Sequence, residues 1–213
     1  MLTTITALLI SYLIGSIPTA YLFVKFSKGI DIRTIGSGNV GATNALRALG
    51  KKAGFTVLLL DILKGFLTVI FLGNFFGRME LALTLESLRI LMGLACICGH
   101  IWTIFLQFKG GKGIATSFGV LLGLALKIEG LNWVVGLLIV LWFMIFFATR
   151  IVSLASLCCA VGLPVLACLF KLPLFFIILS FLLGFFVILR HKPNLLRIIQ
   201  GTEPRLHFKK PQS

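Results

Sequence analysis

Acidic side chains are scarce in this 213-residue sequence, which has 6 aspartate and glutamate residues against 20 lysine and arginine residues. Its two aspartates, Asp31 and Asp61, lie in different parts of the chain and cannot form the paired-aspartate metal site of alcohol phosphotransferases. Neither His100 nor His191 is followed five residues later by an aspartate, which excludes the H-x-x-x-x-D motif of the common coenzyme A-dependent phospholipid acyltransferases. No His/Cys cluster predicts zinc, so we expect neither a metal nor a cofactor.

Long polar regions are also lacking. The sequence is 59% hydrophobic, with a mean hydropathy of +1.09, whereas soluble domains average roughly 45–50% apolar residues. The excess lies in long runs, and the basic residues lie between and after them, so we expect lipid rather than nucleic acid as the partner. The predicted fold class is an all-α polytopic membrane protein, with one transmembrane domain over residues 1–213 and a monomeric state.

Seven apolar runs are candidate spans of a bilayer core about 30 Å thick: Leu2–Val24, Ala53–Phe76, Ala82–Phe108, Ile114–Leu126, Leu131–Ala148, Val152–Phe170 and Leu172–Leu189. The fourth run is short, because a helix of its length covers only roughly 20 Å. Seven spans would place most of the 20 basic residues on one side of the membrane. The positive-inside rule then predicts an outer N-terminus and a cytoplasmic C-terminus.

The polar segment Gly36–Arg47 reads G-S-G-N-V-G-A-T-N-A-L-R. Glycines allow consecutive backbone N–H groups to turn toward one point, which forms a nest for an anion. Thr43 or Asn44 is expected to cap the following helix, and Arg47 offers a forked donor suited to phosphate. The segment predicts half of a phosphate site, whose candidate residues are Gly36, Ser37, Gly38, Asn39, Thr43, Asn44 and Arg47.

A second polar segment, Gly99–Gly113, reads G-H-I-W-T-I-F-L-Q-F-K-G-G-K-G. It differs from the Walker motif because Lys112 is followed by glycine. Two ammonium groups, glycine amides and a following helix favour an anion, although an ordinary basic loop accounts for the pattern equally well. The candidate residues are Lys109, Gly110, Gly111, Lys112 and Gly113, while His100 is either a packed interfacial residue or a loop anchor.

The third segment, His191–Glu203, reads H-K-P-N-L-L-R-I-I-Q-G-T-E. His191 is suited to proton transfer near neutral pH, and Asn194 to a hydrogen bond with a hydroxyl or an oxyanion. Glu203 is a candidate for orienting His191 or a basic residue. The alternative is a basic tail that lies at the membrane interface. Arg150 and Ser153 are further candidates for the phosphate site.

One span contains two charged residues, Asp61 and Lys64, which are three positions apart and therefore share a helix face. Ionisable groups inside a membrane are usually paired or face a polar interior. The two residues are therefore either a structural ion pair or a means of positioning the polar loops.

Together the three segments resemble the acyl-phosphate-dependent glycerol-3-phosphate acyltransferases of bacterial membranes. The matching motifs are G-S-G-N-x-G-x-T-N-x-x-R, G-H-x-x-x-x-F-x-x-F-K-G-G-K-G-x-A-T and H-x-x-N-x-x-R-x-x-x-G-x-E, which occur here at Gly36–Arg47, Gly99–Thr116 and His191–Glu203. The resemblance covers nearly the whole chain and implies a seven-helix enzyme of the bacterial plasma membrane with its active site on the cytoplasmic face. The implied reaction moves a fatty acyl group from acyl phosphate to the 1-hydroxyl of glycerol 3-phosphate, which gives 1-acyl-glycerol 3-phosphate and inorganic phosphate.

Acyl phosphate is an activated anhydride, so direct attack by a positioned hydroxyl needs no enzyme nucleophile. We expect catalytic roles for Ser37, Arg47, His191 and Asn194, and glycerol 3-phosphate binding by these residues together with Lys112. Lys109 and the Gly110–Gly113 loop would hold the acyl phosphate, although the two lysines can exchange roles. The proton acceptor is either His191 or the donor phosphate. The competing function is a membrane transporter for an anionic solute.

Overall fold

The computed structural model describes residues 1–206, and these residues form helices and loops without a β-strand. The chain divides into two compact units, Met1–Glu129 and Gly130–Ser213, and each is described by itself below. The predicted all-α class is confirmed. One domain over residues 1–213 stays a prediction, and residues 207–213 of it lie outside the described part.

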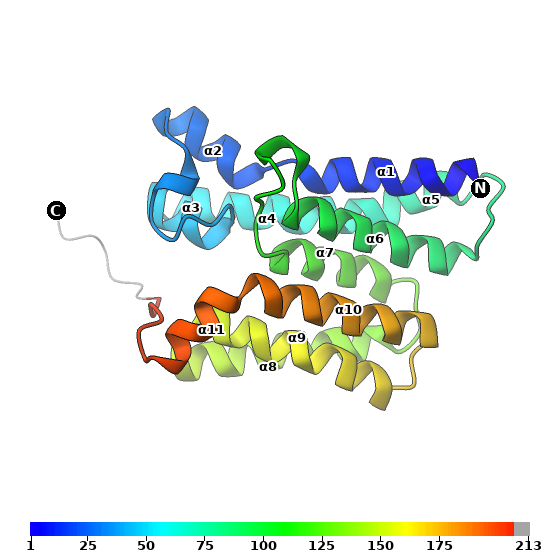
Figure 1. Ribbon diagram of the computed structural model, residues 1–213. Helices are drawn as coiled ribbons and strands as arrows, with labels where there is room; N and C mark the ends of the chain where they lie inside the picture. Colours follow the sequence, from blue (N-terminus) through cyan, green and yellow to red (C-terminus); the bar gives the residue numbers. More distant parts are fainter. Residues whose placement is uncertain (207–213) are drawn as a thin grey trace. The chain divides into compact units, whose positions relative to one another are not determined.

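The first unit contains most of the helices, together with the first two polar segments (Figure 1). Its α-helices are α1 (Leu2–Ser16), α2 (Thr19–Lys28), α3 (Ala42–Leu49), α4 (Lys51–Leu67), α5 (Gly73–Phe76), α6 (Leu85–Ile101) and α7 (Ile114–Ala125). Two 3-10 turns, η1 (Ile32–Thr34) and η3 (Ile104–Leu106), lie in its polar loops. A π-helical turn, η2 (Thr68–Leu72), joins α4 to α5.

The second unit is built from three long helices and a short one, which are α8 (Leu131–Thr149), α9 (Val152–Leu169), α10 (Leu174–Arg190) and α11 (Lys192–Ile199). Helix α9 packs against both α8 and α10 (Figure 1). Helix α11 begins at Lys192, after the single residue His191 that separates it from α10, and Pro193 lies in its first turn, where a missing N–H costs nothing.

Five helical segments within residues 1–206 are long and apolar enough to cross a membrane: Leu2–Lys28, Lys51–Phe76, Leu85–Leu106, Leu131–Thr149 and Val152–Leu169. A sixth arises if α10 and α11 count as one span, although they meet at a bend of 64°. Helix α7, with 12 residues, falls short of this length. The polytopic architecture is confirmed, while the expected seven spans and their orientation stay predictions.

The first apolar run is broken rather than continuous. Helix α1 ends at Ser16, and Ile17 has an extended ψ of 113° because the residue before a proline is kept out of the helical region. The break exposes two backbone carbonyls, which find side-chain donors. Ser16 O accepts a hydrogen bond from Thr103 Oγ1 at 2.5 Å, and Ile17 O accepts one from Lys64 Nζ at 3.1 Å.

Helices α1 and α6 pack closely along their length, and glycines make this approach possible. A Cβ on Gly15 would collide with the carbonyl of Cys96, and a Cβ on Gly99 would collide with the carbonyl of Tyr12. Both obstacles are backbone atoms, which cannot turn aside as a side chain can. Small residues thus let the two helix backbones approach closely, and this contact fixes the end of α6 from which the second polar loop leaves.

Replacement of Gly99 by alanine should destabilise the protein, because the added methyl group overlaps α1 backbone and overpacking costs roughly 1–3 kcal/mol. The matched control is Gly136→Ala in α8, where no atom lies within 4 Å of the added methyl carbon. That substitution should be neutral or slightly stabilising, by up to about 1 kcal/mol, because alanine is the better helix former. Thermal unfolding of both variants in detergent checks the difference, and equal melting temperatures would contradict the assigned helix contact.

Candidate active site

Hydrogen bonds of the Asn44 side chain hold the first polar loop in place. The Asn44 side chain is buried, and its Nδ2 donates to the carbonyls of Ile32 at 3.1 Å and Ile35 at 3.0 Å. Its Oδ1 accepts the backbone N–H of Ser37 at 3.0 Å. Every hydrogen-bonding group of this amide therefore faces loop backbone, which gives Asn44 a positioning role rather than the predicted direct contact with substrate.

Glycine is required at position 36 by two independent facts. Its φ of 58° lies in the left-handed region, which most side chains disfavour. A Cβ there would also collide with Asn44 Oδ1, the atom that holds Ser37. Gly38, with a φ of 68°, completes the turn. The two glycines thus shape the loop that carries Ser37.

The expected helix cap is wrong. Helix α3 begins at Ala42 after Gly41, and no side chain caps it, so Thr43 and Asn44 lie within its first turn. Thr43 is half-buried, as is Asn39. Ser37 and Arg47 are exposed and remain candidates for contact with a ligand.

The second polar loop folds back onto the end of α6. The Gly110 N–H donates to the Ile101 carbonyl at 3.1 Å, and the Gly111 N–H donates to the His100 carbonyl at 3.0 Å. Lys109 is exposed and Lys112 is half-buried. Gly113 precedes α7 with a φ of 85°. The two lysines therefore flank a pair of glycines that is anchored to the helix end.

The two polar loops meet at Gly111. A Cβ on this residue would collide with His100 Nε2 on one side and would lie 2.8 Å from the Val40 carbonyl oxygen on the other. Val40 belongs to the first loop, and it shares a buried apolar cluster with Leu106, which belongs to the second. The structure thus brings together two of the three predicted segments, at a spacing that only glycine permits.

The predicted anion-binding nests are wrong for those backbone amides that already donate hydrogen bonds to other groups of the protein. Gly110 and Gly111 donate to α6 carbonyls, Ser37 donates to Asn44, and Gly38 donates to the Ile35 carbonyl at 3.0 Å. These N–H groups cannot also converge on an anion. The remaining candidates for anion contact in this unit include its charged side chains and the helix starts at α3 and α7, whose first-turn N–H groups favour negative charge.

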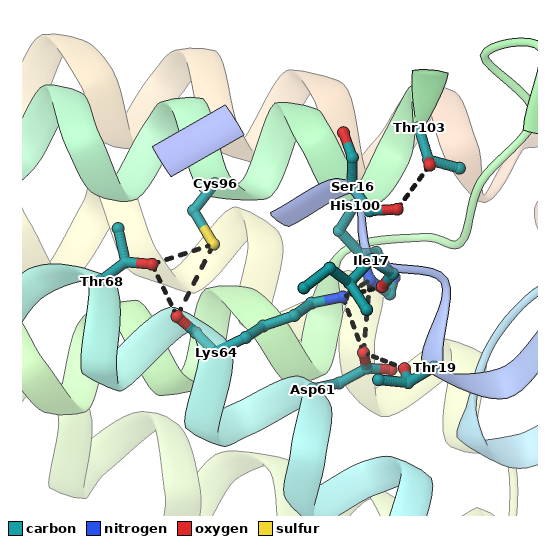
Figure 2. Close-up of polar contacts among 9 residues, drawn as sticks. All are labelled: Ser16, Ile17, Thr19, Asp61, Lys64, Thr68, Cys96, His100 and Thr103. Carbon is teal, nitrogen blue, oxygen red and sulfur yellow. Dashed lines mark hydrogen bonds and ion pairs between the residues drawn. The ribbon is translucent and has the colours of Figure 1, made fainter. Parts of the chain in front are cut away.

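A buried polar cluster lies directly behind the second loop (Figure 2). Lys64 and Asp61 form an ion pair of 2.8 Å, and Asp61 Oδ1 also accepts a hydrogen bond from Thr19 Oγ1 at 2.6 Å. Lys64 Nζ lies 2.9 Å from His100 Nδ1. The predicted Asp61–Lys64 pair is confirmed, and His100 is joined to it. Sequence reasoning missed Thr19, which no local pattern singles out.

In the second unit, Glu203 gathers side chains from two segments. Its Oε1 accepts hydrogen bonds from Ser153 Oγ at 2.7 Å and Asn194 Nδ2 at 2.5 Å. Its Oε2 accepts one from Arg197 Nε at 2.7 Å. Glu203 is therefore an organising carboxylate. Sequence reasoning overlooked Arg197, although it lies three residues after Asn194 and hence on the same face of α11.

The carboxyl of Glu203 keeps its charge despite partial burial. Burial alone would raise its pKa, but the hydrogen bonds from Ser153, Asn194 and Arg197 outweigh this effect and lower the pKa below its usual range. The charged form is therefore the one that the surrounding donors hold. Arg150 is exposed. Its guanidinium lies 5.9 Å from the Phe147 ring centre.

His191 is buried at the junction of α10 and α11. Its Nδ1 lies 2.8 Å from the Val187 carbonyl oxygen. A carbonyl can only accept, so Nδ1 carries the hydrogen, and in the neutral ring Nε2 is then the basic nitrogen. This tautomer suits the predicted proton-acceptor role.

Substitution of Gly36 by alanine should cost more stability than the same change at Gly29. Both glycines have positive φ values, 58° and 70°, so both variants carry a strain of roughly 1–2 kcal/mol. Only the Gly36 variant also displaces Asn44, because no atom lies within 4 Å of a Cβ at Gly29. Leaving buried amide groups unpaired should add about 1–3 kcal/mol. Melting curves of the two variants in detergent test this, and equal losses would contradict the Asn44 clamp.

Acidification should weaken the contacts of Glu203. Because its pKa is lowered in the folded state, the stability that it contributes is fully present above the ordinary glutamate pKa of about 4.3. This contribution is lost as the pH falls through the folded-state pKa. We expect Glu203→Gln to melt at a lower temperature than wild type at pH 7 and to lose less stability on acidification.

Asp31→Asn is the control for this measurement, because the pKa of Asp31 is lowered as well, chiefly by its hydrogen bond from Arg33. The Asp31→Asn variant should still lose stability on acidification, reduced only by the part of that loss that Asp31 itself causes in wild type. A Glu203→Gln protein with the full acid sensitivity of wild type would show that the contacts of Glu203 do not stabilise the fold.

Known proteins are similar to this one over nearly the whole chain. Residues 5–201 match the model of the glycerol-3-phosphate acyltransferase family. A glycerol-3-phosphate acyltransferase of Macrococcus caseolyticus is 45% identical over 204 residues, which cover 95% of this chain and 97% of that protein. Its counterpart in Bacillus cytotoxicus is 43% identical over 212 residues, which cover 100% of both chains.

Two solved structures are also similar. Both are crystal structures of PlsY, described as an integral membrane glycerol 3-phosphate acyltransferase. The glycerol 3-phosphate form has a TM-score of 0.83 and 35% identity and covers 96% of each chain. The lysophosphatidic acid form has a TM-score of 0.80 and 34% identity and covers 96% of this chain and 95% of that one. The chain described here thus belongs to the glycerol-3-phosphate acyltransferase family and is an integral membrane acyltransferase of lipid synthesis.

Proposed function

We propose that this protein transfers a fatty acyl group from acyl phosphate to the 1-hydroxyl of glycerol 3-phosphate. The hydroxyl oxygen attacks the acyl carbonyl carbon, and the bond between that carbon and the bridging oxygen of the phosphate breaks. The products are 1-acyl-glycerol 3-phosphate and inorganic phosphate. Family membership supports the acceptor, and the lysophosphatidic acid form of the related structure supports the product class.

The observation that carries the proposal is the contact between the two polar loops at Gly111 and Val40. It places the segment with Ser37 and Arg47 beside the segment with Lys109 and Lys112. Both substrates carry a phosphate, and cationic side chains stabilise phosphate through charge-assisted hydrogen bonds. We assign the phosphate of glycerol 3-phosphate to Arg47 and Lys112, and that of the donor to Lys109, with the two lysines interchangeable.

Acyl phosphate supports direct transfer because the leaving group is already activated. The protein then has to hold the two substrates in line and stabilise the charge that develops on the carbonyl oxygen. We assign Ser37 to the orientation of glycerol 3-phosphate. From the second unit, we assign His191 and Asn194 to the same reaction, with Ser153, Arg150 and Glu203 in support.

The hydroxyl proton has two acceptors in this scheme. Nε2 of His191 is the basic nitrogen of the neutral ring, since Nδ1 donates to Val187. The phosphate oxygen of the departing group is the other acceptor. In both routes the proton ends on the released phosphate or on a histidine that returns it to solvent, so the reaction balances without a metal or a cofactor.

The long apolar helices would house the acyl chain, which accounts for an enzyme built within the bilayer. We place the protein in the bacterial plasma membrane as a monomer, with the reaction at the cytoplasmic face. The basic loops favour that face under the positive-inside rule. Arg47 and Lys109 are exposed, as this placement requires.

Purified protein in detergent, supplied with palmitoyl phosphate and glycerol 3-phosphate, should form lysophosphatidate and release phosphate in equal amounts. Arg47→Ala and His191→Ala should each lower kcat/KM by about 100-fold or more, since general acid–base and charge stabilisation contribute on that order. Arg78→Ala, in the short turn after α5 and outside all three motifs, serves as the control and should keep wild-type rates. Folded Arg47 and His191 variants with wild-type rates would overturn the site assignment, and solute flux without phosphate release would indicate a transporter.

A further inference from the structure

We propose that His100 is a positioning residue for the reaction proposed above. In this proposal its imidazole ring is held by the buried Asp61–Lys64 pair and packs against Gly111, and so sets where the loop with Lys109 and Lys112 lies against the first loop. The inference rests on the proposed function. It gives a role to three buried titratable residues, Asp61, Lys64 and His100, which the reaction scheme above does not use.

The chain of contacts begins at Lys64, whose ammonium is fully engaged. Its three hydrogens match three acceptors: Asp61 Oδ1 at 2.8 Å, the Ile17 carbonyl at 3.1 Å and His100 Nδ1 at 2.9 Å. Figure 2 shows all three acceptors converging on the lysine nitrogen. An ammonium with three fixed acceptors has no alternative orientation, so Lys64 is a rigid reference point inside the unit.

The backbone at Lys64 is fixed as well. Its carbonyl accepts a hydrogen bond from Thr68 Oγ1 at 2.7 Å and a weaker one from Cys96 Sγ at 3.8 Å. These contacts lie where α4 passes into the π-helical turn Thr68–Leu72. Both ends of the lysine are therefore immobilised.

The next link is the tautomer of His100. A lysine ammonium can only donate, so Nδ1 must accept, and the ring hydrogen resides on Nε2. Asp61 Oδ1 lies farther from the same ring nitrogen, at 3.6 Å, so the closest polar partner of Nδ1 is the ammonium. The ring is thus held with Nδ1 toward Lys64 and Nε2 toward the second loop.

The final link is Gly111. A methyl group at this position would collide with His100 Nε2 and approach the Val40 carbonyl oxygen to 2.8 Å, so the loop backbone fills the gap between the ring and the first loop without slack. The Gly111 N–H also donates to the His100 backbone carbonyl at 3.0 Å. A shift of the ring must therefore displace Gly111 and, with it, the lysines on either side.

The experiment compares three variants in purified, folded protein. Asp61→Leu/Lys64→Met removes both charges at once, which avoids the uncompensated charge that a single change would bury, and it removes the partner of His100. His100→Asn keeps an acceptor near the Nδ1 position for Lys64 but does not reach Gly111. Arg89→Gln is the control, because Arg89 is a buried cation of the same helix, bonded to Asn74 at 2.6 Å, about 17 Å along α6 from His100.

Each variant is assayed for its melting temperature, for kcat, and for KM with palmitoyl phosphate and glycerol 3-phosphate. The double variant and His100→Asn should each lower kcat/KM by about 10- to 100-fold, the loss expected from a displacement near 1 Å. The loss should appear chiefly as a higher KM for a phosphate-bearing substrate. Arg89→Gln should melt earlier than wild type yet keep kcat/KM within about twofold, since its contacts end far from the loops.

Wild-type kinetics in a stable His100→Asn protein would overturn the inference, because the Nε2 side of the ring would then be dispensable. An equal loss of kcat/KM in Arg89→Gln would also overturn it, since the effect would follow general stability. Failure of the proposed function is a separate result, visible as absent acyl transfer by the wild-type protein before any variant is compared.

Discussion

A lysine buried within an apolar span must have all three of its hydrogens accepted, and the arrangement of the first unit follows from that requirement. Burial of an unpaired ammonium costs several kcal/mol, so the fold must place acceptors around Lys64. Asp61 supplies charge from the same helix, Ile17 supplies a carbonyl from the first helix pair, and His100 supplies a ring nitrogen from α6. One group thereby ties three separate segments of the unit together.

The break at Pro18 belongs to the same constraint. A continuous first helix would bond its own carbonyls and leave Lys64 with one acceptor fewer. The proline ends α1 and releases the carbonyls of Ser16 and Ile17. The sequence pattern predicted a first span at Leu2–Val24 but not its interruption, because a proline within an apolar run is equally compatible with a kinked helix and with a new one. The helical segment also continues to Lys28.

The glycine motifs show most clearly where prediction from sequence succeeds and where it fails. Their composition singled out Gly36 and Gly111 as anion-binding glycines, whereas the structure shows two positions where a Cβ would collide with neighbouring atoms. The role of the glycines was misjudged, because spacing along the chain cannot reveal that the amides of Gly110 and Gly111 meet the carbonyls freed at the end of α6. Likewise, Asn44 was predicted as a ligand contact, whereas its amide is engaged with the backbone of the first loop. Glu203 was predicted to orient His191 or a basic residue, and the basic residue that it meets is Arg197. Partners distant in sequence decide these roles, and local patterns carry no information about them.

The small number of acidic residues has a physical consequence for the charge of the polar loops. Within residues 1–206, the acidic partners of the ion pairs are Asp31, Asp61 and Glu203, which pair with Arg33, Lys64 and Arg197. Arg47 and Lys109 form no ion pair with an acidic residue of that part of the chain, and both are exposed. Because these three carboxylates pair with other cations, they leave the charges of Arg47 and Lys109 uncompensated, and exposed cations of this kind favour phosphate. In the proposed reaction, the three carboxylates would thus support anion recognition indirectly, since they hold the fold without neutralising Arg47 or Lys109.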